Sequence, residues 1–452
     1  MKNNSKDMTV GVPLKLLLAF ALPVFFDNLF QQIYTVVDTA IVNKTLGADA
    51  LAAVGSIGSV NFLILGFCTG MAMGFAIPVS QRFGAKDEEG VKNYVGNAVW
   101  LYILIASIFT ILSALFCRNI LEWTKTPDNI IDMAYDYLFV IFLGIPVMFA
   151  YNALAAMIRS IGDSKTPLKI MIITSLLNVV LDLLFIRVFG FGTMGAALAT
   201  VLSELVATIG CLVLIYLKIP ELKIHKENLK LRSEYIVGLL KNGAPMALQM
   251  SVTGVGSIIL QTSVNVLGSL AVAAVTAAER IGNLMSVPLS SLGSAMSVYC
   301  GQNLGAMKIE RISKGVKTGI SIGILFSLIA GGVLMLFGQQ LTLVFLDANS
   351  SKLIEMTYSY LLIIACFLWA QSLIFTVRFS VQGLGFGSVA LCACVLEMIA
   401  RTSFGLYFIP KYGFEVAGFS SPAAWIMADL LLVPSMIFIV KRMMNQKKST
   451  VE

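Results

Sequence analysis

The first long apolar run of the chain is LKLLLAFALPVFFDNLFQQIYTVV, residues 14–37. It is longer than the apolar core of a signal peptide, and no small-residue cleavage site follows it. A run of this length can cross the hydrocarbon core of a bilayer as an α-helix. We therefore interpret residues 14–37 as part of a first membrane-spanning helix rather than as a cleaved leader.

The composition of the whole chain supports this interpretation. Of its 452 residues, 58% are hydrophobic and 13% are charged, and the mean hydropathy is +0.86. Soluble globular proteins contain about 25% charged residues, so this composition argues against a large soluble enzyme and against a disordered chain. It indicates an all-α polytopic membrane protein, in which about 240 residues would form twelve spans of roughly 20 residues each.

Twelve apolar segments are long enough to span the membrane as helices. Pro23, Pro146, Pro245 and Pro288 fall inside four of them, and proline can bend a membrane helix. We expect bending at Pro23 in particular. The predicted helices cover residues 14–42, 51–81, 93–117, 134–158, 166–187, 194–217, 240–267, 270–302, 318–346, 353–377, 386–409 and 414–440.

The distribution of basic residues predicts the orientation of these helices. With the N-terminus inside, the cytoplasmic loops and tails carry 24 of the 32 Lys and Arg residues, and the opposite loops carry 6. This bias predicts a multi-pass protein of the cell membrane with both termini in the cytoplasm. The net charge of +7 is not gathered into a basic face with interleaved aromatic residues, which argues against nucleic-acid binding. We expect a monomer in the lipid bilayer.

The sequence contains no motif for a cofactor or a resident metal. Its seven cysteines mostly lie in apolar stretches without a CxxC pair, and its only histidine, His225, lies in a lysine-rich loop. This pattern argues against a disulfide framework and against a zinc site. An intramembrane metalloenzyme would need a motif such as HExxH, and no predicted span contains a histidine. We therefore expect neither enzymatic activity nor a cofactor.

The two halves of the chain repeat each other at a nearly constant offset. Six spans in each half give both copies the same orientation, which predicts two six-helix lobes related by a pseudo-two-fold axis along the membrane normal, as in many transporters. The predicted lobes are residues 1–217 and 240–452, joined by a cytoplasmic loop at 218–239. Matching positions are Pro23 and Pro245, 46–47 and 267–268, 52–54 and 273–275, and 81–85 and 302–306.

Several acidic residues lie inside the predicted spans. A charge at mid-bilayer costs roughly 2.5–3.5 kcal/mol, so each of them needs a structural or functional reason. Glu397 and Arg401 are four residues apart on one helix, and we expect them to neutralise each other. We interpret Asp429 as a packing residue that forms hydrogen bonds. The acids that we expect to be buried are Asp27, Asp38, Asp182, Glu204, Glu279, Glu397 and Asp429.

The first span carries a polar stripe. Asp27, Gln31, Tyr34 and Asp38 follow one another at i, i+4, i+7 and i+11, which places them on one helical face. Lipid could not satisfy these groups, so we expect the stripe to face an interior cavity. Hydrogen bonding that holds neighbouring helices together is the alternative interpretation.

The fifth span carries a second polar pair, Asn178 and Asp182, on one face. Neither Asp38 nor Asp182 has a Lys or Arg within one helical turn. Burial disfavours the charged form of an unpaired carboxyl group, so such a group can accept a proton near neutral pH. Two carboxylates in one pocket could share a proton or hold a sodium ion. The spacing alone does not show that these two share a pocket.

Several segments together resemble the multidrug and toxic compound extrusion (MATE) transporters, and the resemblance spans essentially the whole chain. The first helix resembles theirs in LP at 22–23, NLFQQIY at 28–34 and VDT at 37–39. Their order and spacing are more specific than any single motif. Further matching segments are RSIGD at 159–163, NVVLD at 178–182, GAALAT at 195–200 and QNLGA at 302–306.

What this resemblance implies is a secondary antiporter that exports organic, often cationic, compounds in exchange for protons or sodium. Similar transporters have a cation site in the N-terminal lobe, with carboxylates on helices 1 and 5, asparagines on helices 4 and 5, and a threonine on helix 6. The matching residues here are Asp38, Asn152, Asn178, Asp182 and Thr200. Whether Glu279 and Glu397 of the second half take part stays open.

Substrate contacts are predicted along the polar stripe of the first span, with methionines as adaptable apolar lining. The nearest alternative function is a flippase for lipid-linked precursors, a role found in the same superfamily. Such a flippase would favour an arginine-rich cavity for pyrophosphate, whereas we expect only two arginines, Arg280 and Arg401, to be buried. The predicted substrate-lining residues are Asp27, Gln31, Tyr34, Met71, Met73 and Met148.

Overall fold

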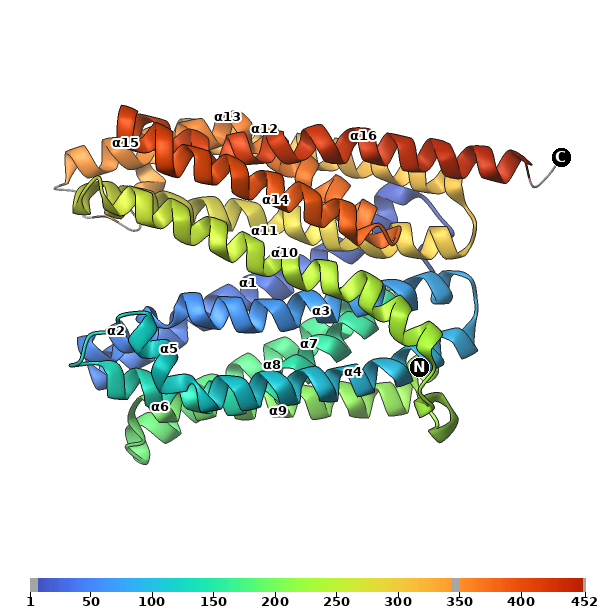
Figure 1. The fold of residues 1–452 in the computed structure, drawn as a ribbon, viewed down its shortest axis with the longest axis horizontal. Coiled ribbons are helices and arrows are strands. Elements are labelled where there is room, and N and C mark those ends of the chain that lie inside the picture. Colours follow the sequence, from blue (N-terminus) through green and yellow to red (C-terminus); the bar gives the residue numbers. More distant parts are fainter. Residues whose placement is uncertain (1–6, 344–345, 347–349, 450–452) are drawn as a thin grey trace. The chain divides into compact units, whose positions relative to one another are not determined.

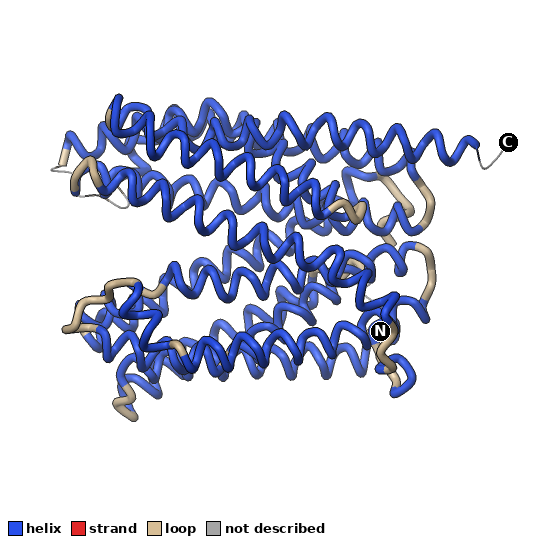
Figure 2. Tube along the Cα trace, viewed as in Figure 1, coloured by secondary structure: helices blue, strands red, loops and turns tan. Residues whose placement is uncertain are grey.

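The computed structural model describes residues 7–343, 346 and 350–449 of the chain. Within these residues every regular element is a helix, and short loops join the helices (Figure 2). A helix satisfies all its backbone hydrogen bonds internally, which a chain surrounded by hydrocarbon requires. The prediction of an all-α membrane protein is confirmed.

The N-terminal half contains the helices α1 to α9. A π-helical segment, η1 (Leu183–Val188), continues α8, and two short turns, η2 (Pro220–Leu222) and η3 (Lys226–Leu229), follow α9. The α-helices are α1 (Pro13–Leu46), α2 (Ala48–Ser56), α3 (Gly58–Gly84), α4 (Glu88–Leu115), α5 (Cys117–Trp123), α6 (Ile131–Leu143), α7 (Ile145–Ser160), α8 (Lys165–Asp182) and α9 (Gly192–Lys218).

The C-terminal half contains the helices α10 to α16. A second π-helical segment, η4 (Phe404–Phe408), continues α14, and η5 (Phe414–Phe419) precedes the last helix. The α-helices are α10 (Ser233–Asn265), α11 (Ser269–Gly305), α12 (Ile309–Thr342), α13 (Ser351–Gly383), α14 (Gly387–Ser403), α15 (Ile409–Tyr412) and α16 (Ser420–Ser449).

The described residues supply the twelve spans that the sequence predicts. Eleven helices are long and apolar enough to cross a membrane, and the pair α6 and α7, bent by 51°, makes the twelfth. The break falls at Gly144, just before Pro146, where a proline is expected to bend a membrane helix. Pro23, Pro245 and Pro288 lie inside α1, α10 and α11.

The chain divides into two compact units by its internal contacts. Among the described residues, the first unit comprises residue 7 and residues 22–247, and the second comprises residues 8–21 and those from 248 onward. Each of α1 and α10 therefore contributes residues to both units. The two units are defined by internal contacts, and their boundaries differ from those of the predicted lobes at 1–217 and 240–452. The division into these two lobes therefore stays a prediction.

The backbone of each unit reproduces the repeat seen in the sequence. Gly47 has a φ of 90° where the chain enters α2, and Gly268 has a φ of 94° where it enters α11. Lys86 and Met307, at equivalent positions of the two halves, both adopt the left-handed region, with φ values of 60° and 54°. Both π-helical segments, η1 and η4, also lie at equivalent places, so the duplication extends to backbone details that few residues favour.

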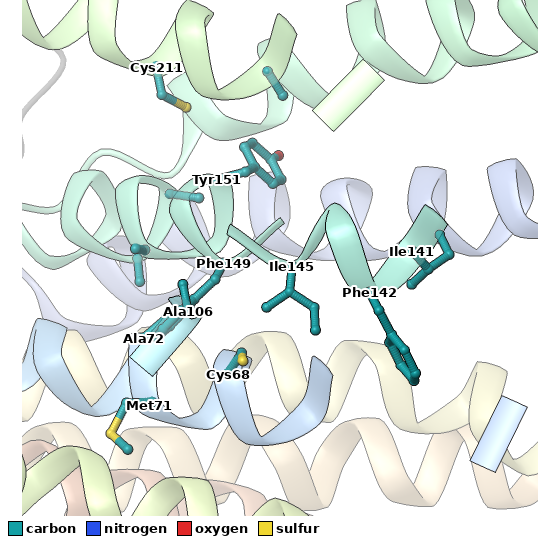
Figure 3. Close-up of a cluster of buried hydrophobic side chains, with 14 of the residues drawn as sticks. Cys68, Met71, Ala72, Ala106, Ile141, Phe142, Ile145, Phe149, Tyr151 and Cys211 are labelled. Carbon is teal, nitrogen blue, oxygen red and sulfur yellow. The ribbon is translucent and has the colours of Figure 1, made fainter. Parts of the chain in front are cut away.

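The core of the first unit is built around α3 and α7, which pack against each other (Figure 1). Large apolar side chains that are almost completely buried fill the space around them, among them Phe142, Ile145 and Phe149 (Figure 3). Cys68 and Met71 of α3 belong to the same cluster. This core fixes the positions of the helices that carry the polar residues described below.

A close helix approach in the first unit depends on glycine. A Cβ atom at Gly74 of α3 would lie 2.5 Å from the Cα of Gly243 in α10 and 2.7 Å from the carbonyl oxygen of Asn242. A Cβ at Gly243 would meet the ring of Phe75 at 2.4 Å. Small residues that let two backbones approach are a common feature of membrane helix packing.

Replacing Gly74 by valine should therefore force α3 and α10 apart. We expect Gly74→Val to lower the free energy of unfolding by about 1–3 kcal/mol, the usual cost of overpacking, and to reduce the melting temperature of the protein in detergent. Gly332→Val in α12 is the matched control, since a Cβ there would meet nothing within 4 Å. Equal melting temperatures for the two variants would contradict the close approach.

Candidate functional site

The four residues of the polar stripe of α1 differ in how deeply they are buried. Asp27 and Asp38 are buried, with 6% and 8% of their surface exposed, Tyr34 is half-buried, and Gln31 is exposed. The two carboxyl groups are therefore buried and Gln31 is not, and the prediction that the stripe faces an interior cavity stays a prediction. Each buried carboxyl group has its own neighbours in the first unit.

Asp38 and Asp182 lie next to each other, so their carboxyl groups interact directly. Asp182 is completely buried. Both of its oxygens, and Oδ1 of Asp38, have no hydrogen-bond partner among the described residues. Tyr137 of α6 lies near both carboxyl groups. The structure thus brings together the two acids that the spacing alone could not connect.

The position of Asp182 follows from the local helix geometry. α8 ends at Asp182, and the wider π-helical segment η1 begins at the next residue. π-helical insertions often occur at functional sites because they re-aim side chains at the end of a regular helix. Asp182 therefore occupies the last α-helical position before the helix widens.

Asn178 and Thr200 lie beside a small cavity close to Tyr34. Neither the amide nitrogen nor the oxygen of Asn178 has a partner among the described residues, and Oη of Tyr34 lies 3.3 Å from Oγ1 of Thr200. The cavity has a volume of about 20 Å³, enough for one water molecule or one small ion. Its lining consists of Tyr34, Met171, Thr174, Ser175, Asn178, Thr200, Ser203 and Glu204.

Two polar residues of this lining on α9 were not predicted as site residues, although Glu204 was named among the buried acids. Ser203 has a buried hydroxyl without a partner, and Glu204 has a buried Oε2 without one, among the described residues. Both follow Thr200 by one helical turn on α9, at i+3 and i+4. That spacing is the signal that could have added them to the predicted site. With them, α9 contributes three polar side chains rather than one.

The fifth predicted cation ligand, Asn152, is placed differently. Its Nδ2 donates to the carbonyl oxygen of Met148 in its own helix, at 2.8 Å. Asn152 does not line the small cavity. Of the five predicted ligands, only Asn178 and Thr200 line this cavity, whereas Asp38, Asn152 and Asp182 do not. Cation binding by all five stays a prediction.

Asp27 has a cationic partner that the sequence did not indicate. Arg159 donates from Nη2 to Oδ2 of Asp27 and forms an ion pair with it. The predicted span that ends at 158 leaves Arg159 in a loop, whereas the structure places it in the last turn of α7. Asp27 is the less exposed partner, at 8% of its side chain against 26% for Arg159. A cationic substrate at Asp27 would have to compete with this guanidinium.

The predicted methionines occupy two kinds of position. Met71 is buried in the apolar core of the first unit (Figure 3), so its direct surroundings are other core side chains. Met73 and Met148 are only half-buried. Their predicted contact with substrate remains a prediction.

The second unit corrects the predicted pairing of Glu397. Glu397 forms an ion pair with Arg378 of α13, not with Arg401 on its own helix. The predicted span ending at 377 leaves Arg378 in a loop, but α13 continues to Gly383 and buries it to 7% exposed surface. A buried carboxylate is costly without a charged partner, and here a residue of a neighbouring helix provides that partner.

Donor atoms of the first unit suit a monovalent cation or a proton. Asp38 and Asp182 supply carboxyl oxygens, and Asn178, Thr200 and Ser203 supply amide and hydroxyl oxygens. Oxygen ligands of this kind bind hard cations, and an adjacent carboxyl pair can hold a proton. Among the described residues, no three His, Cys, Asp or Glu side chains gather as a metal site.

The comparison with known families matches this architecture. The model of the MatE family matches the chain twice, at residues 23–184 and 245–406. The chain belongs to the MatE family. The two matches are of equal length and keep one offset at both ends, from 23 to 245 and from 184 to 406, which confirms the repeat seen in the sequence. Proteins of this family are multidrug transporters, and MATE membership is confirmed.

Curated relatives carry transporter names. The chain is 32% identical over 360 residues to the probable multidrug resistance protein YoeA of Bacillus subtilis, covering 76% of this chain and 77% of YoeA. It is 24% identical over 406 residues to a protein of Shewanella oneidensis named FAD transporter, covering 87% and 88%. The chain is therefore a multi-span membrane protein of a transporter family.

Solved structures share the whole fold. A MATE structure in the bent conformation covers 100% of both chains with a TM-score of 0.92 at 22% identity. An outward-facing multidrug resistance MATE family transporter covers 98% of this chain and 99% of its own, with a TM-score of 0.91 at 22% identity. At this identity the likeness concerns the fold, and it supports the predicted twelve-helix MATE architecture.

The ion pair between Asp27 of α1 and Arg159 of α7 should show strong energetic coupling. In a double-mutant cycle with Asp27→Asn and Arg159→Met, we expect an interaction energy of about 1–3 kcal/mol, because each single variant leaves a buried partner unsatisfied. The measurement is thermal unfolding in detergent. The control cycle uses Arg118 and Asp132, which pair at 2.6 Å on the exposed surface and should couple far more weakly, because water screens an exposed pair. Equal coupling in both cycles would contradict the burial of the Asp27 pair.

Proposed function

We propose that this protein is a secondary antiporter that exports small organic, often cationic, compounds in exchange for protons or sodium by alternating access. The observation that carries this proposal is the pair Asp38 and Asp182, whose carboxyl groups are adjacent, buried and without a cationic partner among the described residues. Two such groups strongly favour the uptake of one positive charge. The names of the relatives support the substrate class.

Cation uptake supplies the driving force in this proposal. In the state open to the outside, a proton or sodium ion binds at Asp38 and Asp182, and substrate leaves. Neutralising the carboxyl pair removes the reason for α1 to keep a polar face in contact with water. α1 can then bend near Pro23, which lacks a backbone N–H group and so weakens the helix there. The outward cavity of the first unit would shrink.

The energy available to this cycle is set by the membrane potential. One charge that moves inward through 100 mV supplies roughly 2.3 kcal/mol. Exchange of one cation for one neutral substrate could therefore sustain a substrate gradient of about fifty-fold. The proposed orientation, with both termini in the cytoplasm, lets the inward potential drive cation entry.

Removing either carboxyl group should uncouple transport. We expect Asp38→Asn and Asp182→Asn to lose the roughly fifty-fold gradient that one charge per cycle can sustain at 100 mV, measured as dye efflux from cells or proteoliposomes. Asp132→Asn is the control, because Asp132 is exposed and its pairing with Arg118 is peripheral. Efflux near the wild-type rate in both test variants would remove the coupling role of this pair.

The coupling ion can be identified with purified protein in vesicles. A pH-sensitive dye inside the vesicle should report proton movement during substrate transport if protons are exchanged, with or without sodium outside. Exchange of sodium would instead make substrate transport depend on a sodium gradient while the internal pH stays constant. Substrate transport that responds to neither gradient would refute the antiport mechanism and leave only facilitated movement.

A further inference from the structure

The second unit contains a polar cavity of about 390 Å³, a volume within the usual range for small-molecule sites. All the residues around it come from α10, α11, α13, α14 and α16 of the second unit. The charged residues in its lining are Glu279, Arg378, Glu397 and Arg401. The cavity therefore belongs to one compact part of the chain and combines both signs of charge.

Arg401 lines this cavity, and within the described part of the chain its guanidinium group is unpaired because Glu397 pairs with Arg378 instead. Glu397, four residues before it on α14, is occupied by Arg378. Among the described residues, the side chain of Arg401 forms neither an ion pair nor a hydrogen bond. A guanidinium presents five N–H donors in a planar fork that matches a carboxylate. Arg401 is thus a donor group without an acceptor.

Glu279 is the complementary group. It lies close enough to Arg401 to interact with it electrostatically, yet the two side chains do not form an ion pair. Glu279 itself lines the cavity. Apart from the paired Arg378 and Glu397, the cavity wall therefore carries one carboxylate and one guanidinium that form no ion pair with each other. Each can bind a ligand group of opposite charge.

The remaining lining offers neutral polar and aromatic contacts. Gln371 uses its Nε2 to donate to Oγ of Ser286 at 2.9 Å, while its Oε1 is buried without a partner among the described residues. Tyr360 and Trp425 are buried side chains of the same wall. Aromatic walls with a few polar groups are typical of sites for small organic ligands.

We propose that this cavity binds an aromatic zwitterion, with the ligand's carboxylate on Arg401 and its ammonium group on Glu279. A purely anionic ligand would meet repulsion from Glu279, and a purely cationic ligand would meet repulsion from Arg401. A ligand with both charges satisfies both groups and leaves the Arg378–Glu397 pair intact. Transport of such a ligand would rest on the proposed function, but binding does not.

The test uses three probes with one aromatic scaffold: tryptophan, a zwitterion; tryptophan methyl ester, a cation; and N-acetyltryptophan, an anion. Equilibrium dialysis of each probe against the purified full-length protein in detergent measures binding without any ion gradient. We expect tryptophan to bind about tenfold more tightly than either blocked probe, the usual effect of one charged hydrogen bond. Equal binding of the three probes, or binding of none, would overturn the proposal.

Substitutions of Arg401 and Glu279 test which residue binds each charged group of the ligand. Arg401→Gln should remove the preference for tryptophan over the methyl ester, and Glu279→Gln should remove the preference over N-acetyltryptophan. Arg280→Gln is the matched control, since Arg280 is exposed, adjacent to Glu279 and absent from the cavity lining. Arg401→Lys keeps the positive charge and should retain part of the preference.

The outcomes separate this inference from the antiporter function. An unchanged preference in Arg401→Gln, with a melting temperature and elution volume like those of the wild type, would contradict the role of Arg401. If Arg401→Gln does not fold, Glu279→Gln and Arg401→Lys decide the question in the same way. Normal dye efflux together with absent zwitterion binding would refute only the second-unit site, whereas binding without efflux would refute only the antiporter.

Discussion

Two carboxyl groups, those of Asp38 and Asp182, are buried without a cationic partner among the described residues. Burying them in a medium of low dielectric constant costs free energy, and this cost constrains the first unit. Asp38 and Asp182 are adjacent and buried, and the apolar core of the first unit holds their helices in place. A soluble protein could hydrate such a pair at little cost, but a span cannot. The unpaired carboxyl groups are therefore costly, and the proposed binding of a proton or sodium ion would offset that cost.

The sequence alone predicted most of the fold. Apolar runs fix the number of spans, because hydrocarbon leaves a chain few alternatives to the helix. The offset between the halves predicted a duplication that the left-handed residues Lys86 and Met307 reproduce. The bend between α6 and α7 was not predicted as a break, although Pro146 was recognised as a residue that can bend the span.

For the candidate site, the sequence predicted which residues share a face of one helix, but not which residues of different helices contact each other. Spacing placed Asn178 and Asp182 on one face, and Thr200 came from the family resemblance. Contacts between helices could not be predicted, because the sequence of one helix does not show which other helix will pack against it. The pairing of Glu397 with Arg378 shows this limit. Glu397 and Arg401 have the i, i+4 spacing that allows an ion pair within α14. In the structure Glu397 pairs with Arg378 of α13 instead.

The two units use one scaffold for different chemistry. At the offset that the two family matches share, Asp38 corresponds to Leu260 and Asp182 corresponds to Phe404. The second unit therefore has no equivalent of the carboxyl pair, and its ionisable residues stand at positions that are neutral in the first, such as Ala156 opposite Arg378. Duplicated halves that had kept the same task would be expected to keep the same charges, since each buried charge is costly. Their different charges agree with the two proposals, a cation site in the first unit and a charge-balanced ligand cavity in the second.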